Sequence, residues 1–160
     1  MQIRPLTNDA EARTAARLMA SSEPWLTLGR TFEESLQLIT DTAREVYVAF
    51  EGEIFQGFVI LNMNGVLSGY LQTVAVAHDA RGSGVGTQLV EFAEKRIFRE
   101  SPNVFLCVSS FNTSARRLYD RLGYQAIGEI ADFLVEGHSE ILMRKSIGPW
   151  REFTPPGDSN

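Results

Sequence analysis

The sequence predicts an α/β (α+β) fold, in which a mixed, mainly antiparallel seven-stranded sheet is flanked by about four helices. Short apolar, often β-branched runs between turn-forming residues predict the strands. Apolar residues at helical spacing predict the helices. The segments follow the order strand, two helices, three strands, then alternating helices and strands, which is typical of helices packed on one sheet. The 160 residues suffice for one domain with a full core, expected over residues 1–146.

The first half of the chain is expected to form four strands and two helices. The strands are expected at residues 2–6, 45–50, 54–63 and 68–77. Thr7 or Asn8 can cap a first helix whose apolar residues continue to about Met19. The segment around Pro24 breaks that helical pattern. A second helix is expected from Thr31, because a glutamate three residues later gives the spacing of a capping box.

The second half alternates helices and strands. Helices are expected at about residues 84–99 and 112–122, and strands at 104–108, 124–132 and 138–145. Pro102 stops the third helix, and Gly123 ends the fourth. Residues 147–160 show little periodicity, so we expect a C-terminal tail that is poorly ordered from Thr154. Trp150 and Phe153 offer apolar surface for packing on the body or on a second subunit.

A glycine-rich loop follows the fourth expected strand and directly precedes the third helix. The strand ends in Val74, Ala75 and Val76, and the loop Arg81–Gly86 contains three glycines. A helix start exposes backbone N–H groups without intrahelical partners and carries a partial positive charge. Glycines let a ligand approach the backbone closely. The loop therefore predicts a phosphate cradle; a glycine turn without a ligand is the alternative.

Known phosphate motifs narrow the choice. The chain contains no G-x-x-x-x-G-K-[ST] string, and the loop reads G-x-G-x-G, whereas dinucleotide-binding folds use G-x-G-x-x-G. Its R-x-x-G-x-G pattern after V-A-V resembles the acyl-CoA pyrophosphate loop of the GNAT superfamily of N-acetyltransferases. Residues 112–124 resemble that family's N-x-x-A-x-x-L-Y-x-x-x-G-[FY] helix. The two motifs come in the family's order, and the resemblance extends over about residues 46–145.

The resemblance implies an enzyme that moves an acetyl group from acetyl-CoA by direct transfer to a primary amine of a small molecule or peptide. It also implies the GNAT fold, in which the fourth and fifth strands splay apart to admit the pantetheine arm. The residues that it assigns to acetyl-CoA are Val74, Ala75, Val76, Arg81, Gly82, Ser83, Gly84, Val85, Gly86, Thr87, Asn112, Ser114 and Tyr119.

Tyr119 is expected to be the general acid. It follows Asn112 by seven residues, about two helical turns, so both side chains lie on one helix face. It matches the family tyrosine placed near the cofactor sulfur, where its phenol could protonate the leaving thiolate. The structural alternatives are a helix N-cap for Asn112, which is compatible with a cofactor contact, and a core aromatic for Tyr119.

The sequence leaves the general base open. In the family branch that acetylates protein N-termini, a glutamate stands five residues before the helix asparagine, and Cys107 occupies that position here. This departure weakens the case for an acetyltransferase of ribosomal-protein N-termini. Many other members carry a carboxylate on the fourth strand, where this chain has Tyr70, Gln72 and Thr73. The candidates for the base, acting directly or through ordered water, are Gln72, Ser109, Ser110, Glu33, Asp132 and His138.

The acceptor groove is expected beside the first two helices, because these helices and their connection flank it in the family. The candidate acceptor contacts are Glu23, Trp25, Leu28, Glu33 and Tyr70. Trp25 could equally belong to the core. Glu33 could be an ordinary first-turn acid favoured by the helix dipole.

Composition excludes several classes of function. The net charge of −5 and the pI of about 5.1 argue against nucleic-acid binding and are compatible with a cationic acceptor. The single cysteine, Cys107, cannot form an internal disulfide, so a reducing, cytoplasmic location is expected. His78 and His138 stand far apart, so no metal site is expected. No transmembrane run or signal-peptide pattern is recognised, and no membrane partner is expected.

Two other functions remain open at this level. A non-catalytic acyl-CoA-binding or sensor module would use the same loop without transferring an acetyl group. A nucleotide-binding protein could use the cradle for another diphosphate, although no acidic residue suited to a ribose follows the loop at the usual spacing. The sequence is compatible with a homodimer.

Overall fold

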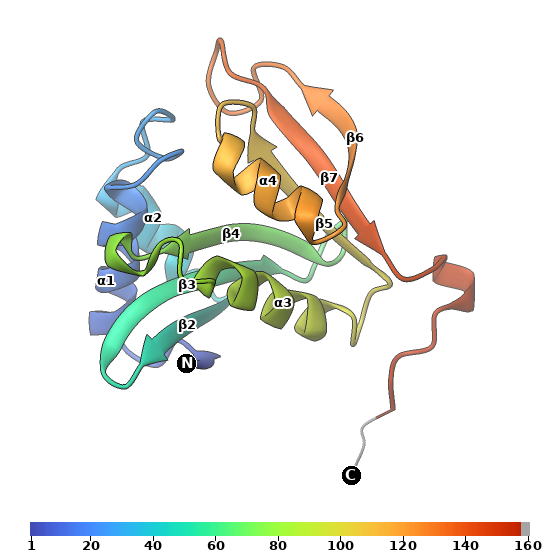
Figure 1. Cartoon of the computed structure of the whole chain (residues 1–160), viewed down its shortest axis with the longest axis horizontal. Coiled ribbons are helices and arrows are strands. Elements are labelled where there is room, and N and C mark those ends of the chain that lie inside the picture. Colours follow the sequence, from blue (N-terminus) through green and yellow to red (C-terminus); the bar gives the residue numbers. More distant parts are fainter. Residues whose placement is uncertain (158–160) are drawn as a thin grey trace.

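The computed structural model describes residues 1–157, which form one seven-stranded sheet with helices on both faces (Figure 1). The strands are β1 (Gln2–Pro5), β2 (Glu45–Glu51), β3 (Ile54–Asn62), β4 (Tyr70–Val76), β5 (Asn103–Ser109), β6 (Gln125–Ile130) and β7 (Glu140–Ser146). The helices are α1 (Asp9–Ala20), α2 (Phe32–Ile39), α3 (Val85–Ile97) and α4 (Thr113–Arg121), with short 3-10 turns at His78–Ala80 and Trp150–Glu152. The predicted fold class is confirmed.

The strand order is β1-β2-β3-β4-β5-β7-β6. Every neighbouring pair is antiparallel except β4 and β5, which are parallel. A parallel pair needs a crossover connection, and α3 supplies it between β4 and β5. The helix that follows the glycine-rich loop is therefore held against the sheet at the centre of the molecule.

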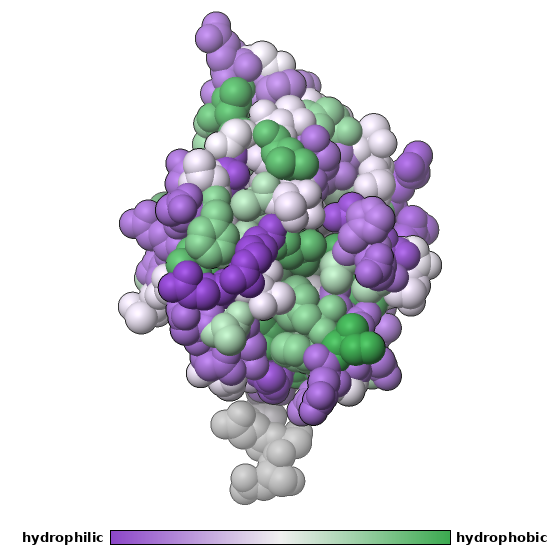
Figure 2. All heavy atoms as spheres, turned by 90° about the vertical axis from the view of Figure 1, so that its left-hand side faces the viewer, coloured by the Kyte–Doolittle hydropathy of each residue, from purple (hydrophilic) through white to green (hydrophobic). Residues whose placement is uncertain are grey.

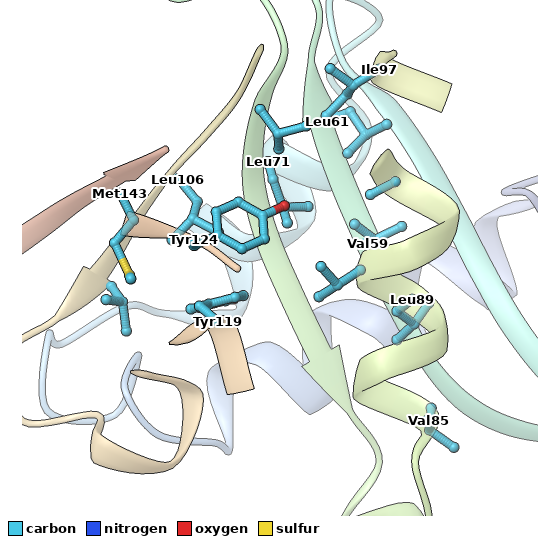
Figure 3. Close-up of a cluster of buried hydrophobic side chains, with 14 of the residues drawn as sticks. Val59, Leu61, Leu71, Val85, Leu89, Ile97, Leu106, Tyr119, Tyr124 and Met143 are labelled. Carbon is cyan, nitrogen blue, oxygen red and sulfur yellow. The ribbon is translucent and has the colours of Figure 1, made fainter. Parts of the chain in front are cut away.

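Two hydrophobic cores hold the helices to the sheet. On one face, α3 packs through Leu89 and Ile97 against a cluster that includes Val59, and α4 joins the same cluster through Tyr119 (Figure 3). On the other face, α1 and α2 bury small and branched side chains against Phe58 and its neighbours. The sheet thus separates a surface covered by α3 and α4 from a surface covered by α1 and α2.

The helix starts follow the sequence signals. Asn8 caps α1 by accepting a hydrogen bond from the Glu11 N–H at 2.9 Å. Thr31 and Glu34 form the expected reciprocal capping box at α2, with distances of 3.2 and 2.8 Å. Both caps satisfy N–H groups that would otherwise lack partners, so they fix where each helix begins.

β4 and β5 are joined at one end only. Their single register pair is Tyr70 with Phe105, supported by a hydrogen bond of 3.0 Å from the Phe105 N–H to the Gly69 carbonyl. Beyond this point the strands diverge toward their C-terminal ends (Figure 1). An irregularity opposite Leu61 adds Gln72 to β4 as an extra residue, as in a β-bulge. From there to Val76, β4 is paired with β3 but not with β5.

Several expected boundaries were wrong by a few residues. α3 ends at Ile97, β4 begins at Tyr70 and β6 begins at Gln125. The expected strand 124–132 ends at Ile130, because Asp132 adopts a φ of 52° that a strand does not allow.

The tail after β7 contains one short 3-10 turn. Trp150 packs edge to face on Phe153, with ring centroids 5.9 Å apart, and keeps 53% of its surface exposed. Residues 154–157 belong to no helix or strand. The predicted disorder at residues 158–160 falls outside the part of the chain that the structure describes. Within residues 1–157, no helix combines the length and apolar character needed to cross a bilayer, and no cluster of three or more His, Cys, Asp or Glu could hold a metal ion.

Candidate active site

A cavity of about 1350 Å³ opens where β4 and β5 diverge. Its walls come from the α1–α2 connection, α2, the β3–β4 connection, β4, the C-terminal half of β5, α4, the loop between β6 and β7, and the start of β7. Figure 2 shows the side of the molecule that lies at the left of Figure 1, where apolar surface is surrounded by hydrophilic side chains. The cavity reaches both layers of the fold, because its lining includes Trp25, which packs on the core under α1 and α2, and Tyr119 of the core under α3 and α4.

Many of the residues singled out in the sequence line this cavity. They are Glu23, Trp25, Leu28, Tyr70, Gln72, Val74, Cys107, Ser109, Asn112 and Tyr119. Four suggested bases, Glu33, Ser110, Asp132 and His138, are not among the lining residues. The glycine-rich loop lies beyond the cavity, at the C-terminal end of β4.

The glycine-rich loop presents a row of free backbone donors. Gly82 and Gly84 have φ values of 76° and 88°, which residues other than glycine rarely adopt. The first hydrogen bond of α3 runs from the Gln88 N–H to the Gly84 carbonyl at 3.1 Å. The N–H groups of residues 82–87 consequently have no backbone acceptor within residues 1–157. Free N–H groups at a helix start are suited to bind an anion such as phosphate, so the predicted phosphate site remains a prediction that this geometry permits.

Arg81 anchors this loop. Its guanidinium donates to the Ser22 hydroxyl at 3.0 Å and to the Val76 carbonyl at 3.3 Å. Ser83 donates to the Ala80 carbonyl at 2.6 Å and so closes the turn. Arg81 therefore ties the end of α1 to the end of β4 and places a positive charge beside the cradle.

The start of α4 approaches the cavity through Asn112. Its Oδ1 accepts a hydrogen bond from the Ala115 N–H at 3.3 Å, which is the N-cap role expected as one alternative. Its backbone N–H donates to the Ser109 carbonyl at 2.8 Å. Ser114 lies exposed at this helix start and donates to the Asn112 Oδ1 at 3.3 Å. The cap thus leaves the Asn112 amide nitrogen for a ligand in the cavity.

Tyr119 is buried and faces the cavity from α4. Its ring packs edge to face on Tyr124, with centroids 5.6 Å apart (Figure 3). Burial raises the pKa of Tyr119 to about 12. The phenol is therefore neutral at physiological pH and has a proton to donate.

The suggested bases have other contacts in the structure. The Gln72 Oε1 accepts a hydrogen bond of 2.8 Å from the Arg44 guanidinium, so its amide is already engaged. The Asp132 Oδ1 accepts one of 2.6 Å from the Gly137 N–H and closes the β6–β7 turn. The His138 ring packs on Phe111 with centroids 5.1 Å apart.

A buried carboxylate that the sequence reading missed lies in the same cavity. Glu140, the first residue of β7, is only 4% exposed, and its Oε1 accepts a hydrogen bond of 2.5 Å from the Ser109 hydroxyl. Burial raises the pKa of Glu140, and the Ser109 hydrogen bond opposes that rise. In sequence, Glu140 is an acid at the start of a strand, and no local pattern distinguishes it from a surface residue. Its pairing with Ser109 depends on the register of β5 and β7.

The model of the acetyltransferase (GNAT) family matches residues 11–124 of this sequence, more than two thirds of the chain. The chain belongs to the GNAT acetyltransferase family.

Individual relatives agree with this assignment. The chain is 31% identical over 102 residues to an uncharacterized N-acetyltransferase of Methanocaldococcus jannaschii; the match covers 62% of this chain and 64% of the relative's length. An aminoglycoside 6′-N-acetyltransferase complexed with coenzyme A superimposes with a TM-score of 0.75 at 18% identity, covering 93% of this chain and 98% of the other. Spermidine N-acetyltransferase from Vibrio cholerae, in complex with CoA and spermine, superimposes with a TM-score of 0.70 at 19% sequence identity. The match covers 91% of this chain and 94% of the other. These two structures share the fold.

Two further groups of this GNAT chain face the cavity between β4 and β5. Burial raises the pKa of the Tyr70 phenol, with smaller contributions from the neighbouring Cys107 thiol and the Glu140 carboxylate. Burial also raises the pKa of Cys107. A thiol held in its protonated form is a poor nucleophile, so Cys107 is unsuited to carry an acyl group.

Proposed function

We propose that this GNAT protein transfers an acetyl group from acetyl-CoA directly to a primary amine. The observation that carries the proposal is the arrangement of three features where the sheet is interrupted, which we call the path. The free N–H groups of residues 82–87 follow the C-terminal end of β4, the edge of β4 beyond Tyr70 is unpaired with β5, and Tyr119 lines the cavity. A long ligand with an anionic end and an amide-containing arm fits such a path.

Each part of acetyl-CoA finds a chemical counterpart along the path. The pyrophosphate would bind the N–H row at the start of α3, with Arg81 adding charge. The pantetheine amides would pair with Val74, Ala75 and Val76 as though they were another strand. A Cβ at Gly86 would lie at van der Waals contact with the side chains of Leu118 and Val76, 3.5 and 3.6 Å away, so the start of α3 lies close to both α4 and β4.

The charges of the cavity favour a cationic acceptor. The lining includes four carboxylate side chains, Glu23, Glu34, Asp41 and Glu140, and one guanidinium, Arg30. Such an excess of negative charge attracts an ammonium group. The two structural neighbours that are named for aminoglycosides and spermidine act on amines. The proposed acceptor is therefore a primary amine that is protonated in solution, on a small molecule or a peptide.

The transfer needs three contributions from the chain. The ammonium must lose a proton, the thioester oxygen must be stabilised as it gains negative charge, and the leaving thiolate must be protonated. A backbone N–H on the free edge of β4 is the candidate partner of that oxygen. Tyr119 is the candidate proton donor for the thiolate. Cys107 takes no part as a nucleophile, so transfer is direct.

The test is an amine screen that records release of the free thiol of CoA. The panel holds spermidine, kanamycin, tyramine and a dipeptide amide at a fixed acetyl-CoA concentration. We expect turnover of at least one amine, and a fall in kcat of about 100-fold in Tyr119→Phe with unchanged acetyl-CoA affinity. Binding of acetyl-CoA without any turnover would instead support the non-catalytic sensor.

A further inference from the structure

Glu140 and Tyr119 approach the cavity from opposite faces of the sheet. Val108 of β5 points into the core that contains Tyr119. Since side chains alternate along a strand, Ser109 points to the other face. Glu140 is the register partner of Ser109 and lies on that same face. Both faces meet in the cavity because β4 and β5 diverge there.

Glu140 differs from the other buried glutamate of the fold. Glu94 is 7% exposed and forms an ion pair of 2.7 Å with Lys145. Glu140 is buried more deeply, and within the described chain its side chain is bonded to the Ser109 hydroxyl, with no cation within 4.0 Å. A buried carboxylate without a cation is destabilising unless something supplies positive charge. The cavity that Glu140 lines is the route by which a cation can reach it.

Three other carboxylates line the cavity, and each has a donor of its own: Glu23 accepts from the Thr27 N–H at 3.2 Å, Glu34 accepts from the Thr31 N–H at 2.8 Å, and Asp41 pairs with the Arg44 guanidinium at 3.8 Å. The groups nearest to Glu140 leave it as the candidate proton acceptor of this face. Tyr70 on β4 and Cys107 on β5 have raised pKa values and stay protonated at neutral pH. His138 precedes β7, but its ring is turned to Phe111 and does not line the cavity.

We propose that Glu140 binds the ammonium group of the acceptor and removes one of its protons, so that it is the general base of the transfer. The proposal rests on the proposed function. The proton passes from the ammonium nitrogen to a carboxylate oxygen of Glu140, and the freed lone pair forms the C–N bond. The C–S bond breaks, and the thiolate takes the hydroxyl proton of Tyr119. The nitrogen of the new amide loses a second proton to solvent, and the solvent returns a proton to the Tyr119 phenolate. Glu140 then releases its own proton to water.

The environment of Glu140 supports this role. Burial raises the pKa of the carboxyl group and so brings its basicity closer to that of an amine, which is the change a general base requires. The Ser109 hydrogen bond limits that rise and fixes the direction of one oxygen. Ser109 is therefore a positioning residue.

The decisive variant is Glu140→Gln, which keeps the size of the side chain and an oxygen for the Ser109 hydroxyl. Its kcat/KM is measured with the amine that the wild type turns over fastest, from pH 5 to pH 10. We expect a loss of about 100-fold at neutral pH, with an acetyl-CoA Kd within about twofold of the wild type. The loss should shrink as pH rises, because the free amine then forms without a base.

Two further measurements distinguish a base from a structural residue. An acceptor of the same skeleton with an electron-withdrawing group has an amine of lower pKa, so Glu140→Gln should lose much less activity with it. Ser109→Ala removes a hydrogen bond that lowers the Glu140 pKa, so the acidic limb of the pH profile should move to higher pH. The matched control is Glu129→Gln, which removes one negative charge from an exposed position of β6.

The outcomes separate the two proposals. If the wild type turns over amines and Glu140→Gln retains its rate and pH profile, the assignment of Glu140 is wrong and the proposed function stands. Equal losses with both acceptors would also overturn the assignment, since a structural defect ignores the acceptor pKa. If the wild type turns over no amine, the proposed function fails and the assignment of Glu140 fails with it.

Discussion

Gly69 lies where β4 and β5 meet, immediately before the strands diverge. Its φ is 86°, and its carbonyl accepts the hydrogen bond from the Phe105 N–H. A Cβ at this position would stand 2.5 Å from the Asn103 carbonyl oxygen and 2.6 Å from the Ile97 Cγ2. The joined end of the two strands therefore requires a residue without a side chain, and we predict that Gly69→Ala is strongly destabilising.

The expected magnitude follows from two contributions. A left-handed backbone costs a residue with a side chain about 1–2 kcal/mol. Forcing an extra methyl group against a backbone oxygen and a packed helix costs about a further 1–3 kcal/mol. The free energy of unfolding should fall by about 2–5 kcal/mol, and a chain of this size should lose very roughly 5–15 °C in Tm.

The assay is urea unfolding monitored by far-UV circular dichroism, with Gly65→Ala as the matched control. Gly65 lies in the same β3–β4 connection with a φ of 105°, but a Cβ there meets no atom within 4 Å. Gly65→Ala should therefore show the backbone contribution alone, about 1–2 kcal/mol. The reasoning is refuted if Gly69→Ala is no less stable than Gly65→Ala, because the close approach to β5 would then carry no energy.

Three more predictions concern titratable groups. Burial raises the pKa of Tyr119 to about 12, above the ordinary tyrosine pKa of 10, so kcat should not fall as pH approaches 10. A fall of kcat near pH 10 in a stopped-flow pH profile would exclude Tyr119 as the acid. Arg4 donates to both Glu11 carboxylate oxygens, at 2.7 and 3.1 Å, and holds the Glu11 pKa at about 2. Glu11→Gln should lower the free energy of unfolding in urea by about 1–2 kcal/mol at pH 7. The difference from the wild type should shrink from about pH 4.5 toward pH 2, because protonation of Glu11 removes the same contribution from the wild type. An equal difference at pH 7 and pH 2.5 would contradict this. Because the pKa of Glu140 is raised, the folded state binds that proton more tightly than the unfolded state, and the wild type loses stability as pH rises above 4.5. Glu140→Gln should therefore have a Tm at pH 8 no lower than that of the wild type. A clearly lower Tm of the variant would show that the carboxylate stabilises the fold.

The fold was predictable because its signals are local. The spacing of three residues between Thr31 and Glu34 predicts the start of α2, and the structure contains that capping box. The alternation of Val46, Val48 and Phe50 in β2 and the continuous apolar run Phe58–Leu61 in β3 identify strands that face a core. Short-range periodicity therefore sufficed for the number and type of the elements, whereas the ends of α3 and β6 depend on tertiary contacts and were misplaced by a few residues.

The site was predictable in part. Asn112 and Tyr119 share a helix face, so their common exposure to the cavity follows from helical geometry. Gln72 could be assigned to a strand, but its extra place in the register and its bond to Arg44 arise from the pairing of β4 with β3 and from the approach of β2. Glu140 gave no signal, since its burial depends on strand pairing across 31 residues. Long-range register is information that spacing along the chain does not contain.

The central claim is that the loop at residues 82–87 holds the pyrophosphate of acetyl-CoA, and isothermal titration calorimetry with Thr87→Glu tests it most directly. Thr87 lies in the first turn of α3, where the helix dipole stabilises a carboxylate. The Thr87→Glu variant should therefore fold while its negative charge repels a phosphate. Thr87→Val, neutral and similar in size, is the control. We predict micromolar binding of acetyl-CoA to the wild type and to Thr87→Val, and its loss in Thr87→Glu. Absence of binding to the wild type, or equal binding to all three proteins, would contradict the account.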